Sequence, residues 1–402
     1  MSLEDGYRSE EDALAELLPG PQAQASVYAF RLIERRGKRG VEIPEARPRT
    51  IAKVGVVGAG LMARQLALLF LRRLEVPVVL RDLTQEQVDD ALGWIRSELT
   101  ALVARGRLGE GKARFLGAIA TGDTGWNAFE GCDLVLEAVF EELAVKKDVF
   151  AELERVVAPE CVLATNTSSL SVTHTAADLK RPERVVGMHF FNPVAVLPLV
   201  ELVRTAQTDD VTLASAWDVT GRLRKRGVLV RDAPAFVVNR ILSRTTTVLM
   251  DALEHGNSIE ETDEAVLRLG LPMAPSVLLQ MVGPRVANHV LETLNEAYPD
   301  RFPLSPTLAN LSAGKDEAVV RGDARRGVDE IQEAVLEAIA DEVRHLLDEG
   351  VVASAADVDA CLVLGAGYPF HLGGITKHLD QTGVSKRVLG ATLAEYRSAV
   401  PA

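Results

Sequence analysis

The chain has 402 residues, of which 47% are hydrophobic, and its formal net charge is -13 at pH 7. This length and apolar content suffice for two or three domains with sizeable cores. The negative charge argues against nucleic acid or an anionic membrane as the main partner, because either would be repelled at long range. Neither a signal segment nor an apolar run of roughly 20 residues is present, so we expect a cytoplasmic protein without a membrane span.

Three cysteines, Cys132, Cys161 and Cys361, form no CxxC pair and have no spacing typical of a metal site. We therefore expect small buried hydrophobic residues in a reducing compartment, and no bound metal.

Residues 1–50 are polar and read as a lead-in to the first strand rather than a domain. Within them, 26–38 resembles a helix, because Val27, Phe30 and Ile33 recur at helical spacing. We expect this apolar face to pack on another part of the chain.

From Ile51 onward, apolar strands alternate with longer helical segments. We predict strands at 51–57, 76–81, 133–139, 161–165, 184–190, 198–203 and 228–230, and helices at 60–74, 85–117, 142–157 and 209–225. Such alternation is typical of a parallel sheet with helices on both faces. Beyond Ala235 the pattern predicts only helices and short loops.

The helical part contains an internal repeat. Three segments recur in similar form about 94 to 97 residues later. Met250–Gly256 corresponds to His345–Gly350, Ser258–Asp263 to Ser354–Asp359, and Val266–Pro272 to Cys361–Pro369. We predict two copies that pack face to face, because each presents the same apolar surface.

The predicted fold is therefore an α/β Rossmann-type nucleotide-binding domain followed by a duplicated all-α C-terminal domain. The expected divisions are a lead-in with a linker-like helix at 1–50, the nucleotide domain at 51–231, a first helical domain at 232–322 and a second helical repeat at 323–402.

The run Val54–Ala63 ends a strand and opens a helix with a glycine-rich turn. Gly58 suits the tight turn and Gly60 lets the backbone approach a pyrophosphate, while Ala63 is tolerated where helix and sheet pack. Asp82 ends the next strand, where a carboxylate accepts both ribose hydroxyls and repels a 2′-phosphate. We expect NAD rather than NADP, although the neighbouring Arg81 weakens this preference; the alternative is a structural glycine turn without a nucleotide.

His189 lies in the apolar run 187–193, and Glu201 lies in the next apolar run. A histidine whose second ring nitrogen is held by a carboxylate can act as a general base. With a dinucleotide site upstream, this pair points to hydride transfer from a secondary alcohol. The alternative is a hydrogen-bonded histidine of the core.

Five motifs together resemble the L-3-hydroxyacyl-CoA dehydrogenases in order and spacing. They are Asn166–Leu170, Gly187–Pro193, Leu197–Glu201, Asp232–Arg240 and Leu271–Pro275. The duplicated helical part is similar to the dehydrogenase portion of the multifunctional fatty-acid oxidation alpha subunit, in which a hydratase domain precedes a linker helix. The resemblance implies NAD-dependent oxidation of an L-3-hydroxyacyl-CoA in fatty-acid β-oxidation, and a hydratase or thiolase as a partner.

The resemblance also implies roles for individual residues. His189 would be the base, Glu201 its partner, Ser168 a contact of the substrate oxygen, and Asn239 a donor that closes the site. The residues expected along the cofactor are Gly58, Gly60, Leu61, Met62, Asp82, Val139, Glu141, Lys146, Asn166, Ser168 and Asn192. The structural alternatives are a strand-end cap for Ser168, a helix N-cap for Asn239, and a solvated helix start for Glu141 and Lys146.

Coenzyme A carries phosphates, so an acidic chain needs a local basic patch. The best candidate is the set Arg96, Arg105, Arg107, Lys112 and Arg114, unless these charges form only a solvated face. A hydroxyacid dehydrogenase that does not use CoA, or a non-catalytic scaffold in a multienzyme complex, are the remaining alternatives. In the second repeat the position of Asn239 falls near Glu333, so we expect that copy to be structural.

Overall fold

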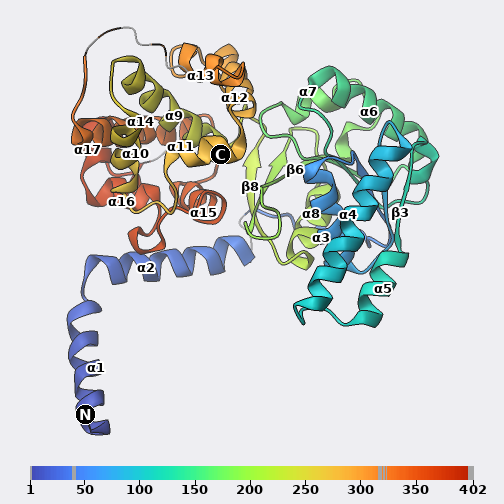
Figure 1. Cartoon of the computed structure of the whole chain (residues 1–402), viewed down its shortest axis with the longest axis horizontal. Coiled ribbons are helices and arrows are strands. Elements are labelled where there is room, and N and C mark those ends of the chain that lie inside the picture. Colours follow the sequence, from blue (N-terminus) through green and yellow to red (C-terminus); the bar gives the residue numbers. More distant parts are fainter. Residues whose placement is uncertain (1, 39–41, 316–318, 320–321, 323, 397–402) are drawn as a thin grey trace. The chain divides into compact units, whose positions relative to one another are not determined.

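The computed structural model describes residues 2–38, 42–315, 319, 322 and 324–396 (Figure 1). The chain forms two compact units. One is Gly40–Phe236, and the other combines Met1–Arg39 with Val237–Ala402. The domain limits expected at 50, 231 and 322 remain predictions.

The Gly40–Phe236 unit is built on an eight-stranded sheet with the order β3-β2-β1-β4-β5-β6-β7-β8. Its strands are β1 (Val54–Val57), β2 (Val78–Arg81), β3 (Ala120–Asp123), β4 (Leu134–Glu137), β5 (Val162–Thr165), β6 (Val185–Phe190), β7 (Leu199–Arg204) and β8 (Arg226–Arg231). The strands from β3 to β6 are parallel. This is the predicted Rossmann-type sheet.

The expectation of a wholly parallel sheet is wrong at one edge. β6 and β7 pair antiparallel, and β8 follows the direction of β7. Only residues 191–198 connect β6 to β7, whereas a parallel crossover needs a dozen residues or more. The short connection therefore forces a reversal.

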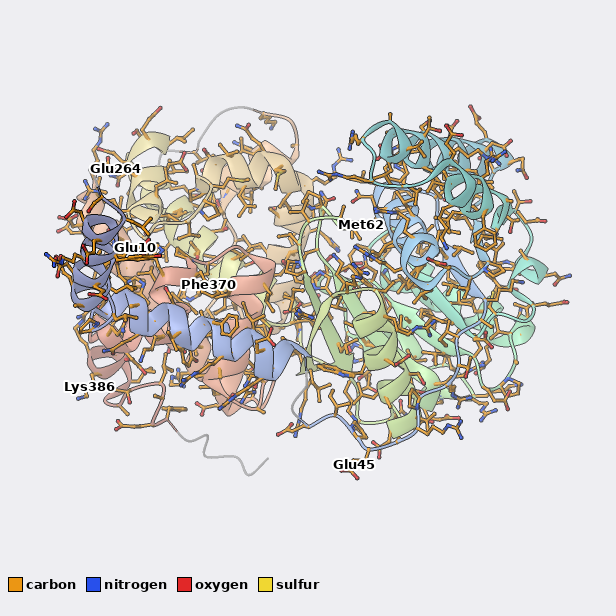
Figure 2. All side chains as sticks on the ribbon, turned by 90° about the horizontal axis from the view of Figure 1, so that it is seen from below. Glu10, Glu45, Met62, Glu264, Phe370 and Lys386 are labelled. Atoms are coloured by element: carbon orange, nitrogen blue, oxygen red, sulfur yellow. The ribbon has the colours of Figure 1, made fainter. Side chains whose placement is uncertain are left out.

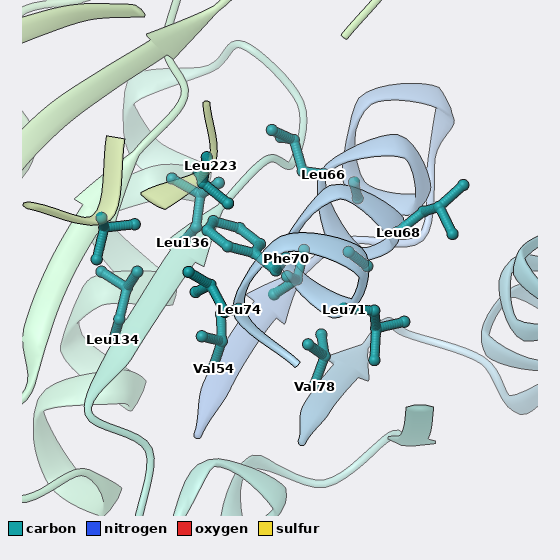
Figure 3. Packing of buried hydrophobic residues seen from close by; sticks show 14 of the residues in the cluster. Val54, Leu66, Leu68, Phe70, Leu71, Leu74, Val78, Leu134, Leu136 and Leu223 are labelled. Atoms are coloured by element: carbon teal, nitrogen blue, oxygen red, sulfur yellow. The ribbon is translucent and has the colours of Figure 1, made fainter. Parts of the chain in front are cut away.

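Helices pack on this sheet through apolar side chains. They are α3 (Leu61–Leu74), α4 (Gln85–Ala104), α5 (Glu110–Ala118), α6 (Leu143–Val156), α7 (Val172–Ala176) and α8 (Asp210–Arg222), with short 3-10 turns η2 (Trp126–Phe129) and η3 (Pro182–Arg184). Figure 3 shows Leu66, Phe70 and Leu74 of α3 among Val54 and Leu136 of the strands, all of them buried. Burial of such side chains, at roughly 1.5–3 kcal/mol each, fixes α3 directly after the glycine-rich turn.

Strand β3 was not predicted, because its sequence Ala-Thr-Gly-Asp contains no apolar run. It lies at the edge of the sheet, next to β2 only. An edge strand can expose polar side chains, so its formation depends on the neighbouring strand rather than on hydrophobic alternation.

The other unit is helical. It contains α1 (Leu3–Leu17), α2 (Pro21–Leu32), the π-helical turn η1 (Ile33–Lys38), α9 (Val238–Glu254), α10 (Ile259–Leu267), α11 (Pro275–Val282), α12 (Pro284–Ala297), α13 (Pro306–Ser312), α14 (Val328–Asp348), α15 (Ala355–Gly365), η4 (Phe370–Leu372), α16 (Ile375–Gln381) and α17 (Val384–Leu389). Helices α9 and α14, which belong to the two predicted copies, pack against each other. Glu333, on α14, pairs with Arg387 of α17 at 2.7 Å.

The predicted repeat is visible in the way its helices are capped. Ser258 and Ser354 both form capping boxes, at the starts of α10 and α15. Five residues after each serine, an aspartate binds the first turn of a later helix: Asp263 accepts bonds from Ser276, and Asp359 accepts the equivalent pair of bonds from Thr376. The same pair of hydrogen bonds to an aspartate therefore joins corresponding helices in both copies.

The predicted helix in the lead-in exists, but its packing face is different from the one expected. Val27 and Phe30 are exposed, whereas Ala25, Ala29 and Leu32 are buried. Helix α2 lies against η4, whose Phe370 is labelled in Figure 2. Small alanines allow the two backbones to approach closely: a Cβ added to Gly373 would lie 3.2 Å from that of Ala25. Helix α1 was not predicted.

All three cysteines are buried, as expected. Burial raises the pKa of Cys132 to about 11 and that of Cys161 to about 12. Their thiols are therefore protonated and unreactive near neutral pH. Within the described part of the chain, no helix combines the length and hydrophobicity that a membrane crossing requires.

Candidate active site

The glycine-rich turn joins β1 to α3 at the carboxyl edge of the sheet. Gly58 has a φ of +108°, and a Cβ there would lie 2.8 Å from the carbonyl oxygen of Ala138, so only glycine fits. At Gly60, the N-cap of α3, a Cβ would meet no described atom within 4 Å. Leu61 and Met62 form the first turn of α3. This open backbone at a helix N-terminus suits a pyrophosphate.

Asp82 follows β2 and turns back toward the same turn. Its carboxylate accepts the backbone N–H of Ala59 at 2.6 Å, which places the acidic group beside the glycine motif. Arg81 has two contacts of its own: its Nε donates to the carbonyl of Thr124 at 3.0 Å, and its guanidinium lies 3.9 Å from the ring centre of Trp126. The Asp82 carboxylate favours a ribose 2′-hydroxyl, from which it can accept a hydrogen bond, over a 2′-phosphate, which it would repel.

His189 and Glu201 face each other across the antiparallel β6–β7 pair. They are register partners, and Nδ1 of His189 lies 2.7 Å from Oε2 of Glu201. Glu201 is fully buried and His189 is 3% exposed. The rings of Phe191 and Phe236 lie 4.4 and 5.7 Å from the imidazole, centre to centre. The contact between Nδ1 of His189 and Glu201 orients the ring and leaves Nε2 as the nitrogen that can take a proton.

Two amides fix the segment that follows His189. Asn166, after β5, accepts the backbone N–H of Phe190 at 2.8 Å. Gln65, on α3, donates to Asn192 at 3.2 Å and accepts the N–H of Val194 at 3.0 Å. The loop that carries Asn192 is thereby tied to the helix that follows the glycine-rich turn. The sequence motifs predict Asn166 and Asn192 as site residues. Gln65 belongs to none of these motifs and is not predicted.

Lys146 is completely buried, which excludes a solvated helix start. Its ammonium group lies 2.6 Å from Glu137 and 3.2 Å from Glu141. Glu141 in turn accepts the backbone N–H of Ser168 at 2.7 Å, and Val139 donates its N–H to Glu137 at 3.0 Å. Four of the predicted site residues therefore belong to one hydrogen-bonded network, and Glu137 is a member that sequence reasoning missed.

Asn239 belongs to the helical unit. It is the second residue of α9, and Val237 is the N-cap, so the N-cap alternative for Asn239 is wrong. The next residue, Arg240, is fully buried and pairs with Glu342 at 2.5 Å and with Glu349 at 2.7 Å. This ion pair ties the start of α9 to α14.

Of the five basic residues proposed for coenzyme A, Arg96 lies on α4, Arg105 and Arg107 lie in the connection to α5, and Lys112 and Arg114 lie on α5. Lys112 is paired with Glu75. Helix α4 begins after Thr84, at the carboxyl edge of the sheet, and its 20 residues measure about 30 Å. Arg105 and Arg107 therefore lie at the end of α4 that is remote from the glycine-rich turn, and Arg96 lies about halfway.

Two family models match the chain. The NAD-binding domain of 3-hydroxyacyl-CoA dehydrogenase matches residues 53–233, and the C-terminal domain of the same enzyme matches residues 236–317. The chain belongs to the 3-hydroxyacyl-CoA dehydrogenase family. It is thus an NAD-dependent oxidoreductase with a Rossmann-type domain and a helical C-terminal domain.

Solved structures of this family resemble the chain over most of their own length. FadB2 of M. tuberculosis is 34% identical with a TM-score of 0.62, and the match covers 69% of this chain and 98% of that one. The (S)-3-hydroxybutyryl-CoA dehydrogenase PaaH1 of Ralstonia eutropha is 32% identical with a TM-score of 0.62, covering 66% and 94%. The 3-hydroxybutyryl-CoA dehydrogenase of Escherichia coli shares the fold at 24% identity, with a TM-score of 0.73 and coverage of 86% and 97%.

Proposed function

We propose that this dehydrogenase oxidises an L-3-hydroxyacyl-CoA to the 3-oxoacyl-CoA in fatty-acid β-oxidation. The observation that carries the proposal is the buried contact between His189 and Glu201. In this reaction Nε2 of His189 takes the hydroxyl proton, while the C3–H bond breaks and its electron pair leaves with the hydrogen as hydride. Gly58, Gly60 and Asp82 would hold NAD, which would accept the hydride.

Glu201 stabilises the imidazolium that forms when His189 takes the proton. Burial strengthens this effect, because the fully buried Glu201 carboxylate is not screened by water. Ser168 would contact the substrate oxygen, and Asn239 would donate an amide hydrogen bond to it. Glu141, Lys146, Asn166 and Asn192 are proposed to line the cofactor, together with Leu61, Met62 and Val139.

For coenzyme A, we propose a contact with Arg96 rather than with Arg105 or Arg107. Arg96 lies about halfway along α4 and is therefore nearer the carboxyl edge of the sheet than Arg105 and Arg107, which follow the end of this helix. A cytoplasmic location and a hydratase or thiolase partner are part of the same hypothesis.

The test is the absorbance of NADH during reduction of 3-oxoacyl-CoA thioesters of several chain lengths. We expect turnover with thioesters and little turnover when NADPH replaces NADH. Turnover of free 3-oxo acids but not of thioesters would instead support a hydroxyacid dehydrogenase that does not use CoA. Lack of turnover with both would refute the proposal.

A further inference from the structure

Three charged side chains meet inside the Gly40–Phe236 unit. Glu137 ends β4, Glu141 lies in the loop that follows, and Lys146 lies in the first turns of α6. The side chains of Glu137 and Lys146 are completely buried, and that of Glu141 is 25% exposed. Removing charged groups from water costs free energy, so a buried group of ions is stable only when ion pairs and hydrogen bonds of good geometry offset this cost.

The two carboxylates outnumber the single ammonium group, and neutral donors satisfy the excess negative charge. Glu137 accepts the hydroxyl of Thr165 at 2.7 Å in addition to Lys146 and the N–H of Val139. Its position is therefore defined from two neighbouring strands, β4 and β5.

Glu141 uses one oxygen for a different segment. Its Oε1 accepts the hydroxyl of Thr167 at 2.6 Å and the consecutive N–H groups of Ser168 and Ser169 at 2.7 and 2.9 Å. Its other oxygen, Oε2, meets Lys146. The backbone of Ser168 is thus held by a carboxylate whose own orientation depends on Lys146.

We propose that Glu137 is a positioning residue for the reaction: it holds Lys146, Lys146 orients Glu141, and Glu141 places the segment that carries Ser168. This inference rests on the proposed role of Ser168. Two residues of the network, Lys146 and Glu141, lie between Glu137 and Ser168.

The charge states support a persistent network. Burial pushes the pKa of Lys146 down, but Glu137 and Glu141 outweigh burial and raise the pKa above its ordinary value. Burial likewise pushes the pKa of Glu141 up, but Lys146 and the donors from 167–169 outweigh it and lower the pKa. Both groups therefore stay charged around neutral pH.

The test uses Glu137→Gln, Glu141→Gln and the double variant in the full-length protein, with Glu152→Gln on the outer part of α6 as the matched control. We expect Glu137→Gln to lower kcat roughly tenfold with little change in the KM for 3-oxoacyl-CoA, and Glu137→Asp to recover part of the loss. The two single effects should not add in the double variant, because both act through one network.

A second readout does not depend on turnover. Hydrogen exchange at the amides of Ser168 and Ser169 should become faster in Glu137→Gln and stay unchanged in Glu152→Gln. Unchanged exchange at both amides, or additive effects on kcat, would overturn the inference. Should the wild type reduce no 3-oxoacyl-CoA, the proposed function fails, and the exchange measurement still decides whether Glu137 sets the Ser168 segment.

Discussion

Nδ1 of His189 and Oε2 of Glu201 lie 2.7 Å apart between two strands that run in opposite directions. The reversal at β7 is what makes them direct register partners, because the connection between β6 and β7 is too short for a crossover. The pair is consequently defined by backbone hydrogen bonding as well as by side-chain packing.

The first prediction concerns the base. His189→Ala should lower kcat about 10²- to 10⁴-fold, because it removes the proton acceptor, while the affinity for NADH is retained. Steady-state kinetics and NADH fluorescence titration measure the two effects. His174, an exposed residue of α7, supplies the control variant His174→Ala. Near-normal turnover of His189→Ala would contradict the assignment.

A second prediction concerns the partner of the base. Glu201→Gln keeps the size of the side chain but removes its charge, so the imidazolium form of His189 loses an anionic neighbour. In the oxidation direction, where His189 acts as the base, we expect lower kcat and an acid limb of the pH–rate profile displaced to lower pH. The exposed Glu160→Gln should leave the profile in place, and an unchanged profile in Glu201→Gln would count against the pair.

The third prediction is a pH dependence of stability in the helical unit. Burial raises the pKa of Asp359 to about 6, against bonds from Thr376 and Tyr28 that lower it. The folded state therefore binds a proton more tightly than the unfolded state, whose value is 3.8. The resulting stabilisation is complete below about pH 4 and is lost as the pH rises through about 6.

Asp359→Asn removes this titration. The free energy of unfolding of the variant minus that of the wild type should increase by about 3 kcal/mol from pH 4 to pH 7, for a pKa shift of this size. The variant therefore gains stability relative to the wild type as the pH rises. Thermal unfolding at several pH values measures it, with Asp300→Asn as the exposed control. A difference that does not vary with pH would show that Asp359 is not the group responsible.

The fourth prediction concerns the ion pairs between α9 and α14. Arg240→Met should destabilise the protein by about 3 kcal/mol, because Glu342 stays buried, loses its contact with Arg240 and retains its contact with Arg301 at 3.2 Å. Urea unfolding measures the loss, and Arg285→Met on the exposed part of α12 is the control. Affinity for NADH should persist, since the glycine motif and Asp82 belong to the other unit.

Hydrophobic patterning predicted the buried elements, such as β1, α3 and β6. Hydrophobic patterning did not predict features that depend on a neighbouring element of structure. β3 is a polar edge strand, and α2 packs through Ala25 and Ala29 rather than through Val27 and Phe30.

The site shows the same limit. Glu141 and Lys146 could be selected through the family resemblance, but the burial of Lys146 could not be predicted, because the start of this helix has the pattern of a solvated one. It depends on Glu137, which faces Lys146 only after β4 and α6 have packed. Gln65 was likewise missed, because its contacts with Asn192 and Val194 join distant parts of the chain.

Both members of the acid–base pair come from one hairpin of the Gly40–Phe236 unit. The backbone pairing of β6 with β7 therefore keeps the carboxylate opposite the imidazole without a contribution from any residue of the helical unit. Substitutions that leave this hairpin paired should accordingly leave the proton-transfer pair assembled.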